Sequence, residues 1–284
     1  MSEKIAFLTV VFPMEENYLT DFFSSLSAQT FKNFDLVVVN DQLQNLDKMI
    51  AQFADLKITV LNFSDTPLKN RQHGIEFILA NNYDIVIFGD SDDYFSSNRV
   101  EVSIEKLAKY DVVVNDLSAF NDSGVYQKKY FSNRLQNDTE ISIEYIKDKN
   151  IFGMSNTALR VRSIGNIIYD SDLIAFDWYI FSLALLKSGV GLFTNECETF
   201  YRQHRGNTVG IGKLDRKLFI KGLAVKKKQY ELLSKEDKRF ESFLNEIDIL
   251  SLLVLDEDLL DTIIASDIKY PFWWEQIKLI EEYK

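Results

Sequence analysis

The tetrapeptide Asp90-Ser91-Asp92-Asp93 is the part of the sequence whose residue types point most directly to chemistry. It follows the apolar run 85–89, so its three carboxylates stand at the end of a strand that we expect to be buried. An unpaired carboxylate in such a place costs several kcal/mol. A divalent cation is the usual compensation, and Mg²⁺ or Mn²⁺ sites commonly combine one or two carboxylates with substrate phosphates. Because Asp and Ser also terminate strands, a plain turn is the alternative on this motif alone.

The elements that must position this motif alternate between strand and helix. Apolar, β-branched runs predict strands at residues 5–11, 35–39, 57–61, 84–88 and 111–115. Apolar residues at helical spacing predict helices at residues 19–28, 47–53, 71–80 and 177–186. Such alternation implies a mostly parallel, Rossmann-like α/β sheet flanked by helices, in which ligands bind beyond the carboxyl ends of the strands. Asp41 and Asp90 both follow strand ends of this kind.

The second half of the chain is less regular. The polar segment 121–137 predicts a hairpin or a loop. From Leu214 onward, alternating charges and few glycines predict a chain that is helical almost throughout. We place a domain boundary near Gly212, which gives one domain over residues 1–212 and a helical C-terminal extension over residues 213–284.

Composition excludes some classes of partner and compartment. The net charge of −11 over 284 residues argues against binding to nucleic acid, which requires a basic surface. A single cysteine, Cys197, allows no intrachain disulfide and fits a reducing compartment. The sequence shows neither a signal peptide nor an apolar run of transmembrane length. We therefore expect a cytoplasmic protein.

Five short motifs follow one another in a recognisable order. They are Phe7-Leu8-Thr9-Val10-Val11 leading on to Val39-Asn40-Asp41, Arg71 with Gly74, Asp90-Ser91-Asp92-Asp93, Phe176-Asp177-Trp178, and Tyr201-Arg202-Gln203-His204 with Gly206 and Asn207. This order resembles the family 2 glycosyltransferases, which are nucleotide-sugar-dependent enzymes of the GT-A fold. The resemblance covers roughly residues 5–210. It implies a nucleotide-sugar half over about residues 1–115 and an acceptor half over about residues 116–212.

The chain departs from the family pattern at several positions. Phe12-Pro13 stands where the family usually has Tyr-Asn, and Asn40-Asp41-Gln42-Leu43 stands for its Asp-Asp-Gly-Ser. Gln72 replaces the Asn that commonly follows the arginine, and Phe176 replaces an acidic residue before the base. None of these changes removes a residue that the chemistry requires.

The resemblance implies donor and metal contacts. A diphosphate and a carboxylate about 4 Å apart repel by roughly 4 kcal/mol at an effective dielectric constant near 20, so a cation must lie between them. Mn²⁺ or Mg²⁺ would be bound by Asp92, His204 and Asp90. The nucleotide, with UDP favoured, would contact Val10, Asp41, Arg71, Asp90 and Arg202. Of these, Asp41 would accept a hydrogen bond from the base.

The resemblance also assigns the catalytic base and an acceptor site. Asp177 would take the proton of the acceptor hydroxyl, with inversion at the anomeric carbon, although a helix N-cap is the structural alternative for this residue. Acceptor contacts would come from Asp93, Ser155, Asn156 and Trp178. Trp178 would stack on a sugar, or else pack in the core.

The function that these features imply is an inverting, metal-dependent hexosyl- or N-acetylhexosaminyltransferase acting on a glycan or lipid-linked acceptor. A non-catalytic module that binds a nucleotide sugar or a glycan is the alternative. A sugar nucleotidyltransferase is less favoured, because Phe12-Pro13 stands where such enzymes have a glycine-rich basic loop. The cluster Pro271-Phe272-Trp273-Trp274 predicts that the C-terminal extension packs on the catalytic domain, contacts a membrane peripherally at its inner face, or forms a homodimer.

Overall fold

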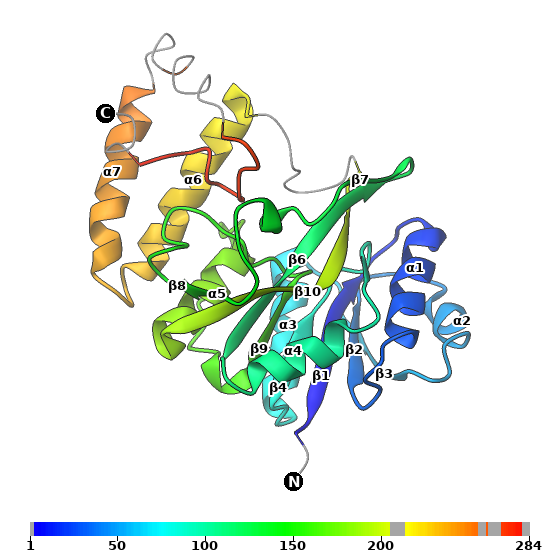
Figure 1. The fold of residues 1–284 in the computed structure, drawn as a ribbon. Helices are drawn as coiled ribbons and strands as arrows, with labels where there is room; N and C mark the ends of the chain where they lie inside the picture. Colours follow the sequence, from blue (N-terminus) through cyan, green and yellow to red (C-terminus); the bar gives the residue numbers. More distant parts are fainter. Residues whose placement is uncertain (1–2, 205–213, 255–259, 261–267, 280–284) are drawn as a thin grey trace.

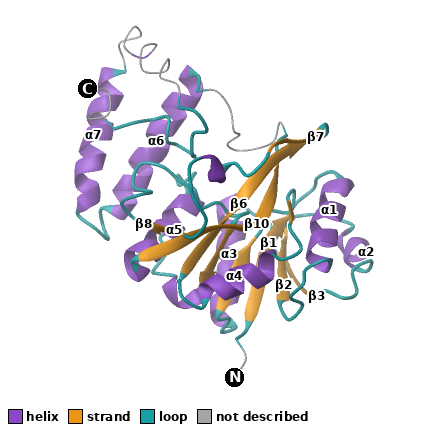
Figure 2. Cartoon of the chain, in the orientation of Figure 1, coloured by secondary structure: helices purple, strands orange, loops and turns teal. Residues whose placement is uncertain are grey.

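A single large sheet forms the centre of the protein, with helices on both of its faces (Figures 1 and 2). The computed structural model describes residues 3–204, 214–254, 260 and 268–279. The ten strands of the sheet follow the order β3-β2-β1-β4-β9-β6-β10-β5, with β7 paired to β6 and β8 paired to β10. This architecture confirms the predicted α/β class with a mostly parallel sheet.

The first half consists of parallel strands joined by helices, as the apolar runs predict. Its strands are β1 (Ile5–Val11), β2 (Asp35–Asn40), β3 (Lys57–Asn62) and β4 (Ile85–Phe88). Its helices are α1 (Glu16–Ser27), α2 (Leu46–Ile50) and α3 (Pro67–Ala80). Helix α3 begins earlier than the predicted residue 71, because Thr66 caps it through the Lys69 N–H and Pro67 stands at its first position.

The second half contains strands that the sequence analysis did not predict. Its strands are β5 (Tyr94–Phe95), β6 (Val112–Asn121), β7 (Gly124–Gln127), β8 (Thr139–Ser142), β9 (Thr157–Arg160) and β10 (Val190–Arg202). Its helical elements are α4 (Arg99–Leu107), η1 (Phe131–Asn133), η2 (Val161–Ser163) and α5 (Phe176–Ser188). Strand β9 lies antiparallel between β4 and β6, and β10 runs parallel to β6. The predicted strand 111–115 is in fact the ten-residue β6.

Two apolar cores lie on opposite faces of the sheet because successive side chains of a strand alternate. Ile5 and Phe7 of β1 face α1, α2 and α4, whereas Ala6 and Leu8 face α3 and α5. Burial of both faces explains why the parallel strands are continuous apolar runs rather than alternating ones.

The C-terminal part is a helical pair followed by an irregular segment. Helices α6 (Arg216–Leu233) and α7 (Arg239–Leu253) lie together beside α5 (Figure 1). The prediction of a helical chain from Leu214 onward is wrong for residues 268–279, which are not helical. The predicted boundary near Gly212 lies outside the described residues. Within the described part of the chain, no helix is both long enough and apolar enough to cross a membrane.

Residues 268–279 return to the sheet domain and are held there by polar contacts. Trp273 forms a β-bridge with Asn150. The guanidinium of Arg134 donates two hydrogen bonds to the carboxylate of Glu275. The ammonium group of Lys226, which is fully buried, donates to the carbonyl oxygen of Ile277. We call residues 268–279 the C-terminal segment.

Gly89 allows the chain to leave β4 between two aromatic rings. A Cβ atom at this position would lie 2.5 Å from the ring of Phe7 and 2.8 Å from that of Phe95. We therefore expect Gly89→Ala to lower the free energy of unfolding by about 1–3 kcal/mol, the usual cost of overpacking.

Urea denaturation would measure this loss, with Gly165→Ala as the matched control. At Gly165 no atom lies within 4 Å of an added Cβ. Equal unfolding midpoints for the two variants would contradict the steric role of Gly89.

Candidate active site

Residues 90–93, which we call the acidic loop, are anchored at the carboxyl end of β4. The hydroxyl of Ser91 donates a 2.8 Å hydrogen bond to the carbonyl oxygen of Val10, at the end of β1. The N–H of Asp90 donates to the hydroxyl of Ser155 at 3.3 Å, and the N–H of Asp93 donates to the carbonyl of Asp90 at 3.2 Å. The loop is thus fixed to two neighbouring segments of the domain.

Asp93 is a structural member of this loop. Its side chain is fully buried and accepts hydrogen bonds from the Ser155 hydroxyl and from the Arg202 N–H, the latter at 2.7 Å. Burial, together with the nearby carboxylates of Asp92 and Asp90, holds the pKa of Asp93 well above its ordinary value. Asp93 therefore joins β10 to the acidic loop.

Three of the four predicted acceptor contacts are buried in this same network. Asp93 is fully buried, Ser155 is 5% exposed, and Asn156 is 1% exposed with its amide bonded to the carbonyls of Asn115 and Ile151. Their polar groups hold the loops in place and present almost no surface to a sugar. Their direct contact with an acceptor stays a prediction.

The side chains of His204 and of Asp92 in the acidic loop face each other. The Nε2 atom of His204 lies 2.9 Å from Oδ2 of Asp92, and both side chains are partly exposed. A carboxylate is a suitable ligand for Mg²⁺ or Mn²⁺, and a second protein donor stands beside it, so the pair fits a divalent cation. Among the described residues, no group of three or more His, Cys, Asp or Glu side chains could hold a metal by itself. A metal at this pair would need oxygen ligands from a substrate. Gly206 and Asn207 of the same motif lie outside the described residues.

Arg71, Asp90 and Asp177 form the other side of the site. The guanidinium of Arg71 lies 3.4 Å from the carboxylate of Asp90. Burial raises the pKa of Asp177 to about 6, although the positive charge of Arg71 opposes the increase, and the charge of Asp90 adds to it. The carboxylate of Asp177 thus lies within electrostatic reach of both residues.

Asp177 is not the N-cap of its helix. Ala175 occupies that position, and Asp177 lies in the first turn of α5, where its Oδ1 accepts the N–H of Trp178 at 2.8 Å. The positive end of the helix dipole favours a charged carboxylate there, typically by less than about 1 kcal/mol. Burial outweighs this effect, since the net change in the pKa of Asp177 is upward.

The packing of the side chains describes two further predicted site residues. Trp178 is fully buried, donates its indole N–H to the carbonyl of Ile146 at 2.8 Å and packs near Tyr230, so it is a core residue. Arg202 is 5% exposed, lies over the rings of Tyr18 and Phe120, and pairs with Asp21 at 2.6 Å. Its Nε atom donates to the carbonyl of Asp92, so Arg202 supports the acidic loop, and its contact with a nucleotide stays a prediction.

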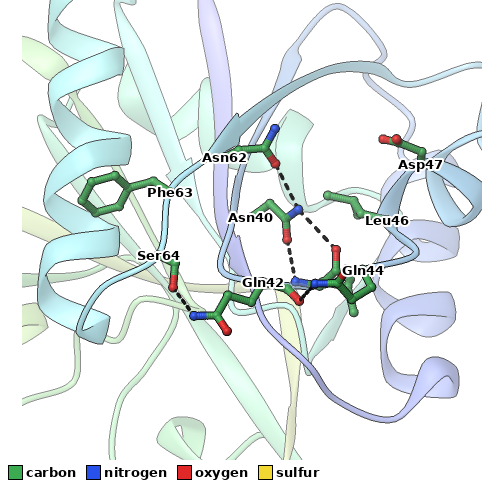
Figure 3. Close-up of a pocket in the computed structure, with 9 residues that line it drawn as sticks. Asn40, Gln42, Gln44, Leu46, Asp47, Asn62, Phe63 and Ser64 are labelled. Atoms are coloured by element: carbon green, nitrogen blue, oxygen red, sulfur yellow. Dashed lines mark hydrogen bonds between the residues drawn. The ribbon is translucent and has the colours of Figure 1, made fainter.

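A polar pocket of about 450 Å³ lies at the carboxyl ends of β2 and β3 (Figure 3). Amide and hydroxyl side chains dominate its lining: Asn40, Gln42, Gln44, Asn62 and Ser64. Asp41 stands beside it and accepts a 2.8 Å hydrogen bond from the amide of Asn70, a buried residue of α3. The sequence analysis did not identify Asn70, although its place directly before Arg71 is a usable signal.

Arg99 is a second residue that the sequence analysis missed. It is fully buried, donates to the carbonyl of Phe88 at 2.5 Å and to Asn115 at 3.0 Å, and lies 4.3 Å from the ring centre of Phe95. Burial lowers its pKa to about 10, while the charges of Asp93 and Asp90 oppose the decrease. Arg99 remains protonated at neutral pH and places a positive charge beneath the acidic loop.

Comparisons with known proteins relate this geometry to one family. Residues 9–172 match the family described as glycosyl transferase family 2. Glycosyltransferase GlyA of Streptococcus pneumoniae serotype 4 (strain ATCC BAA-334 / TIGR4) is 24% identical over 217 residues, which cover 70% of this chain and 31% of that protein. The chain thus spans about a third of the length of this relative.

Solved structures share the fold at low sequence identity. TarS 1–349 of S. aureus in complex with UDP-GlcNAc is 16% identical with a TM-score of 0.59, and the match covers 86% of this chain and 72% of that one. GalNAc-T7 with UDP, GalNAc and Mn²⁺ is 13% identical with a TM-score of 0.55, covering 85% and 55%. These structures confirm the predicted GT-A fold. Because the family match spans more than half of the 284 residues, the chain belongs to glycosyl transferase family 2.

Proposed function

We propose that this chain transfers a sugar from a nucleotide diphosphate donor, a UDP-sugar, to a hydroxyl group of a glycan or lipid-linked acceptor. The observation that carries the proposal is the pair formed by Asp92 and His204, 2.9 Å apart, at the carboxyl end of β4. Parallel sheets bind ligands at this edge. The complexes of TarS with UDP-GlcNAc and of GalNAc-T7 with UDP and Mn²⁺ support the choice of donor and metal.

Asp92 and His204, with Asp90 nearby, would hold Mn²⁺ or Mg²⁺ together with oxygen atoms of the diphosphate. When bound, the cation neutralises the negative charge of the diphosphate leaving group. Asp92 and His204 face each other, whereas Asp90 is turned toward Arg71 at 3.4 Å. Asp92 is therefore the main protein ligand in this proposal, and Arg71 is placed to pair with Asp90 or with the diphosphate.

The nucleoside would lie along the ends of β1 and β2. Asp41 is held in place by the amide of Asn70 and would accept a hydrogen bond from the base, and the main chain at Val10 would line the other side. The polar pocket beside Asp41 extends this surface with amide and hydroxyl groups and the carboxylate of Asp47.

Asp177 would act as the base that takes the proton of the acceptor hydroxyl. With a pKa of about 6 it is ionised at neutral pH and is also a stronger base than an ordinary aspartate. Attack by the acceptor from the face opposite the nucleotide gives inversion at the anomeric carbon. The predicted contact of the C-terminal helices with a membrane or with a second copy stays a prediction.

Removal of the Asp92 carboxylate tests the donor and metal site. A ligand at about 100 times its dissociation constant adds roughly 2.7 kcal/mol of stability, and each kcal/mol raises the melting temperature by about 2–4 °C in a domain of this size. We expect UDP with Mn²⁺ to raise the melting temperature by several degrees, and Asp92→Asn to abolish the increase. Differential scanning fluorimetry measures both.

Asp122→Asn is the matched control, since Asp122 is exposed in the turn between β6 and β7. It should keep the full increase in melting temperature. An unchanged response of Asp92→Asn to UDP with Mn²⁺ would remove Asp92 from the site, and the absence of any response in the unmodified protein would argue against the donor proposal.

Asp177→Asn separates catalysis from stability. We expect the turnover number to fall by about 10²–10⁴, the usual contribution of a general base, while the response to UDP is kept. Below about pH 6 the unmodified enzyme should also lose activity, because Asp177 becomes protonated. Initial rates of donor hydrolysis or transfer across pH 5–8 measure this loss.

The same variant should be at least as stable as the unmodified protein at pH 7.5. The folded pKa of Asp177, about 6, lies above the ordinary value of 3.8, so the contribution of this group to stability falls as the pH rises through that range. Asp172→Asn, at a side chain that is 79% exposed, is the control. Unimpaired turnover in Asp177→Asn would exclude Asp177 as the base.

A further inference from the structure

Two aromatic side chains of the C-terminal segment, Tyr270 and Trp273, are not fully enclosed by the core. Phe272 is 2% exposed and Trp274 is 7% exposed, whereas Trp273 between them is only partly buried. Trp274 and Ile277 pack against Gly222 of α6, where an added Cβ would lie 2.4 Å from Ile277. The neighbours of Trp273 therefore fix the segment to the core, and Trp273 itself lies at the edge of the core.

The main chain at Trp273 is held rigidly. The N–H of Trp273 donates to the carbonyl of Asn150 at 3.1 Å, and the N–H of Asn150 donates back to the carbonyl of Trp273 at 2.9 Å. The side chain of Asn150 is fully buried and is itself bonded to the main chain of Phe152. On either side, the Tyr130 hydroxyl donates to the carbonyl of Pro271 at 2.8 Å, and Glu275 is paired with Arg134. An aromatic ring on such a support is pre-organised for binding.

The indole ring of Trp273 contacts both chain segments that hold the acidic loop. One is Gly153, where an added Cβ would lie 3.2 Å from Cη2 of the indole, and Ser155 of the same turn bonds to Asp93. The other is Tyr201, whose ring centre lies 6.2 Å from that of Trp273 at an interplanar angle of 85°. Tyr201 precedes Arg202, whose N–H also bonds to Asp93. The indole thus lies one residue layer away from the acidic loop.

The charge environment agrees with this location. The carboxylates of Asp93, Asp90 and Asp92 all help to raise the pKa of Tyr201, after the larger effect of burial. Tyr201 therefore lies near both the carboxylates and Trp273. A partly exposed aromatic ring beside a polar, acidic site offers an apolar surface where the surrounding groups offer hydrogen bonds.

We propose that Trp273 is the aromatic residue that binds the acceptor, by packing its indole against the apolar face of a hexopyranose ring. The acceptor is accordingly a glycan with an accessible hexose unit, and its aromatic contact comes from the C-terminal segment rather than from Trp178. This inference rests on the proposed function, since it names the acceptor class of the same site. The position of the indole also explains why residue 153 is a glycine, because a side chain there would collide with the indole and with Asn156.

Saturation-transfer difference NMR on the full chain tests the proposal with defined probes. The probes are the methyl α- and β-pyranosides of glucose, galactose and N-acetylglucosamine, each added with UDP and Mg²⁺. The unmodified protein should transfer saturation to the ring protons of at least one glycoside. In Trp273→Ala we expect this signal to fall about two- to tenfold, as for a lost aromatic contact, and in Trp273→Phe to fall less.

The UDP resonances in the same sample serve as the internal control, together with Tyr126→Ala, at a side chain that is 53% exposed on β7. UDP signals should be equal in all four proteins, which shows that each variant is folded and binds the donor nucleotide. If UDP is bound but the glycosides respond equally in Trp273→Ala, or give no signal in the unmodified protein, the proposal for Trp273 is overturned. Absence of the UDP signal from the unmodified protein would instead reject the proposed function.

Discussion

The crowding of three carboxylates into the acidic loop is the physical constraint on which the rest of the site depends. Two like charges about 4 Å apart repel by roughly 4 kcal/mol at an effective dielectric constant near 20. The fold supplies the opposing charges from separate elements. Arg99 of α4 lies beneath the loop and Arg71 of α3 lies beside Asp90. Arg202 of β10 adds hydrogen bonds, from its main-chain N–H to the Asp93 carboxylate and from its Nε to the main-chain carbonyl of Asp92. Because these cations come from distant parts of the chain, stabilising the loop also brings α3, α4 and β10 together.

The parts of this arrangement that the sequence predicts are those determined by local pattern. The strands at residues 5–11, 35–39 and 57–61 are continuous apolar runs between polar turns. A strand that is covered on both faces shows this sequence pattern, because all of its side chains are buried. The resemblance predicts that Asp92 and His204 lie close together, and they lie 2.9 Å apart; that they bind a metal stays a prediction. For these features, the residue types and their order carry enough information.

The features that the sequence does not predict depend on the direction in which a side chain points and on contacts between distant residues. Strand β10 mixes charged and apolar residues and contains an irregularity between Thr194 and Glu198, so neither helical nor strand periodicity is clear in it. The two tryptophans show the same limit. Trp178 adjoins the predicted base in sequence but points into the core, whereas Trp273 lies almost a hundred residues further on and approaches the site. A residue's type states what it can do, and only the tertiary structure states where its side chain points.

The contacts of the C-terminal segment also bear on the order in which the two sides of the site form. The pairs Arg134–Glu275 and Tyr130–Pro271 each join residues 141 positions apart. Contacts across such long intervals carry more loop-closure entropy than local contacts do, and chains rich in them fold more slowly. A ribosome delivers β1 to β4 first, so the half that contains Asp41 and Asp92 has all of its strands long before Trp273 emerges. Folding during synthesis would thus build the side of the site with Asp41 and Asp92 before the C-terminal segment docks.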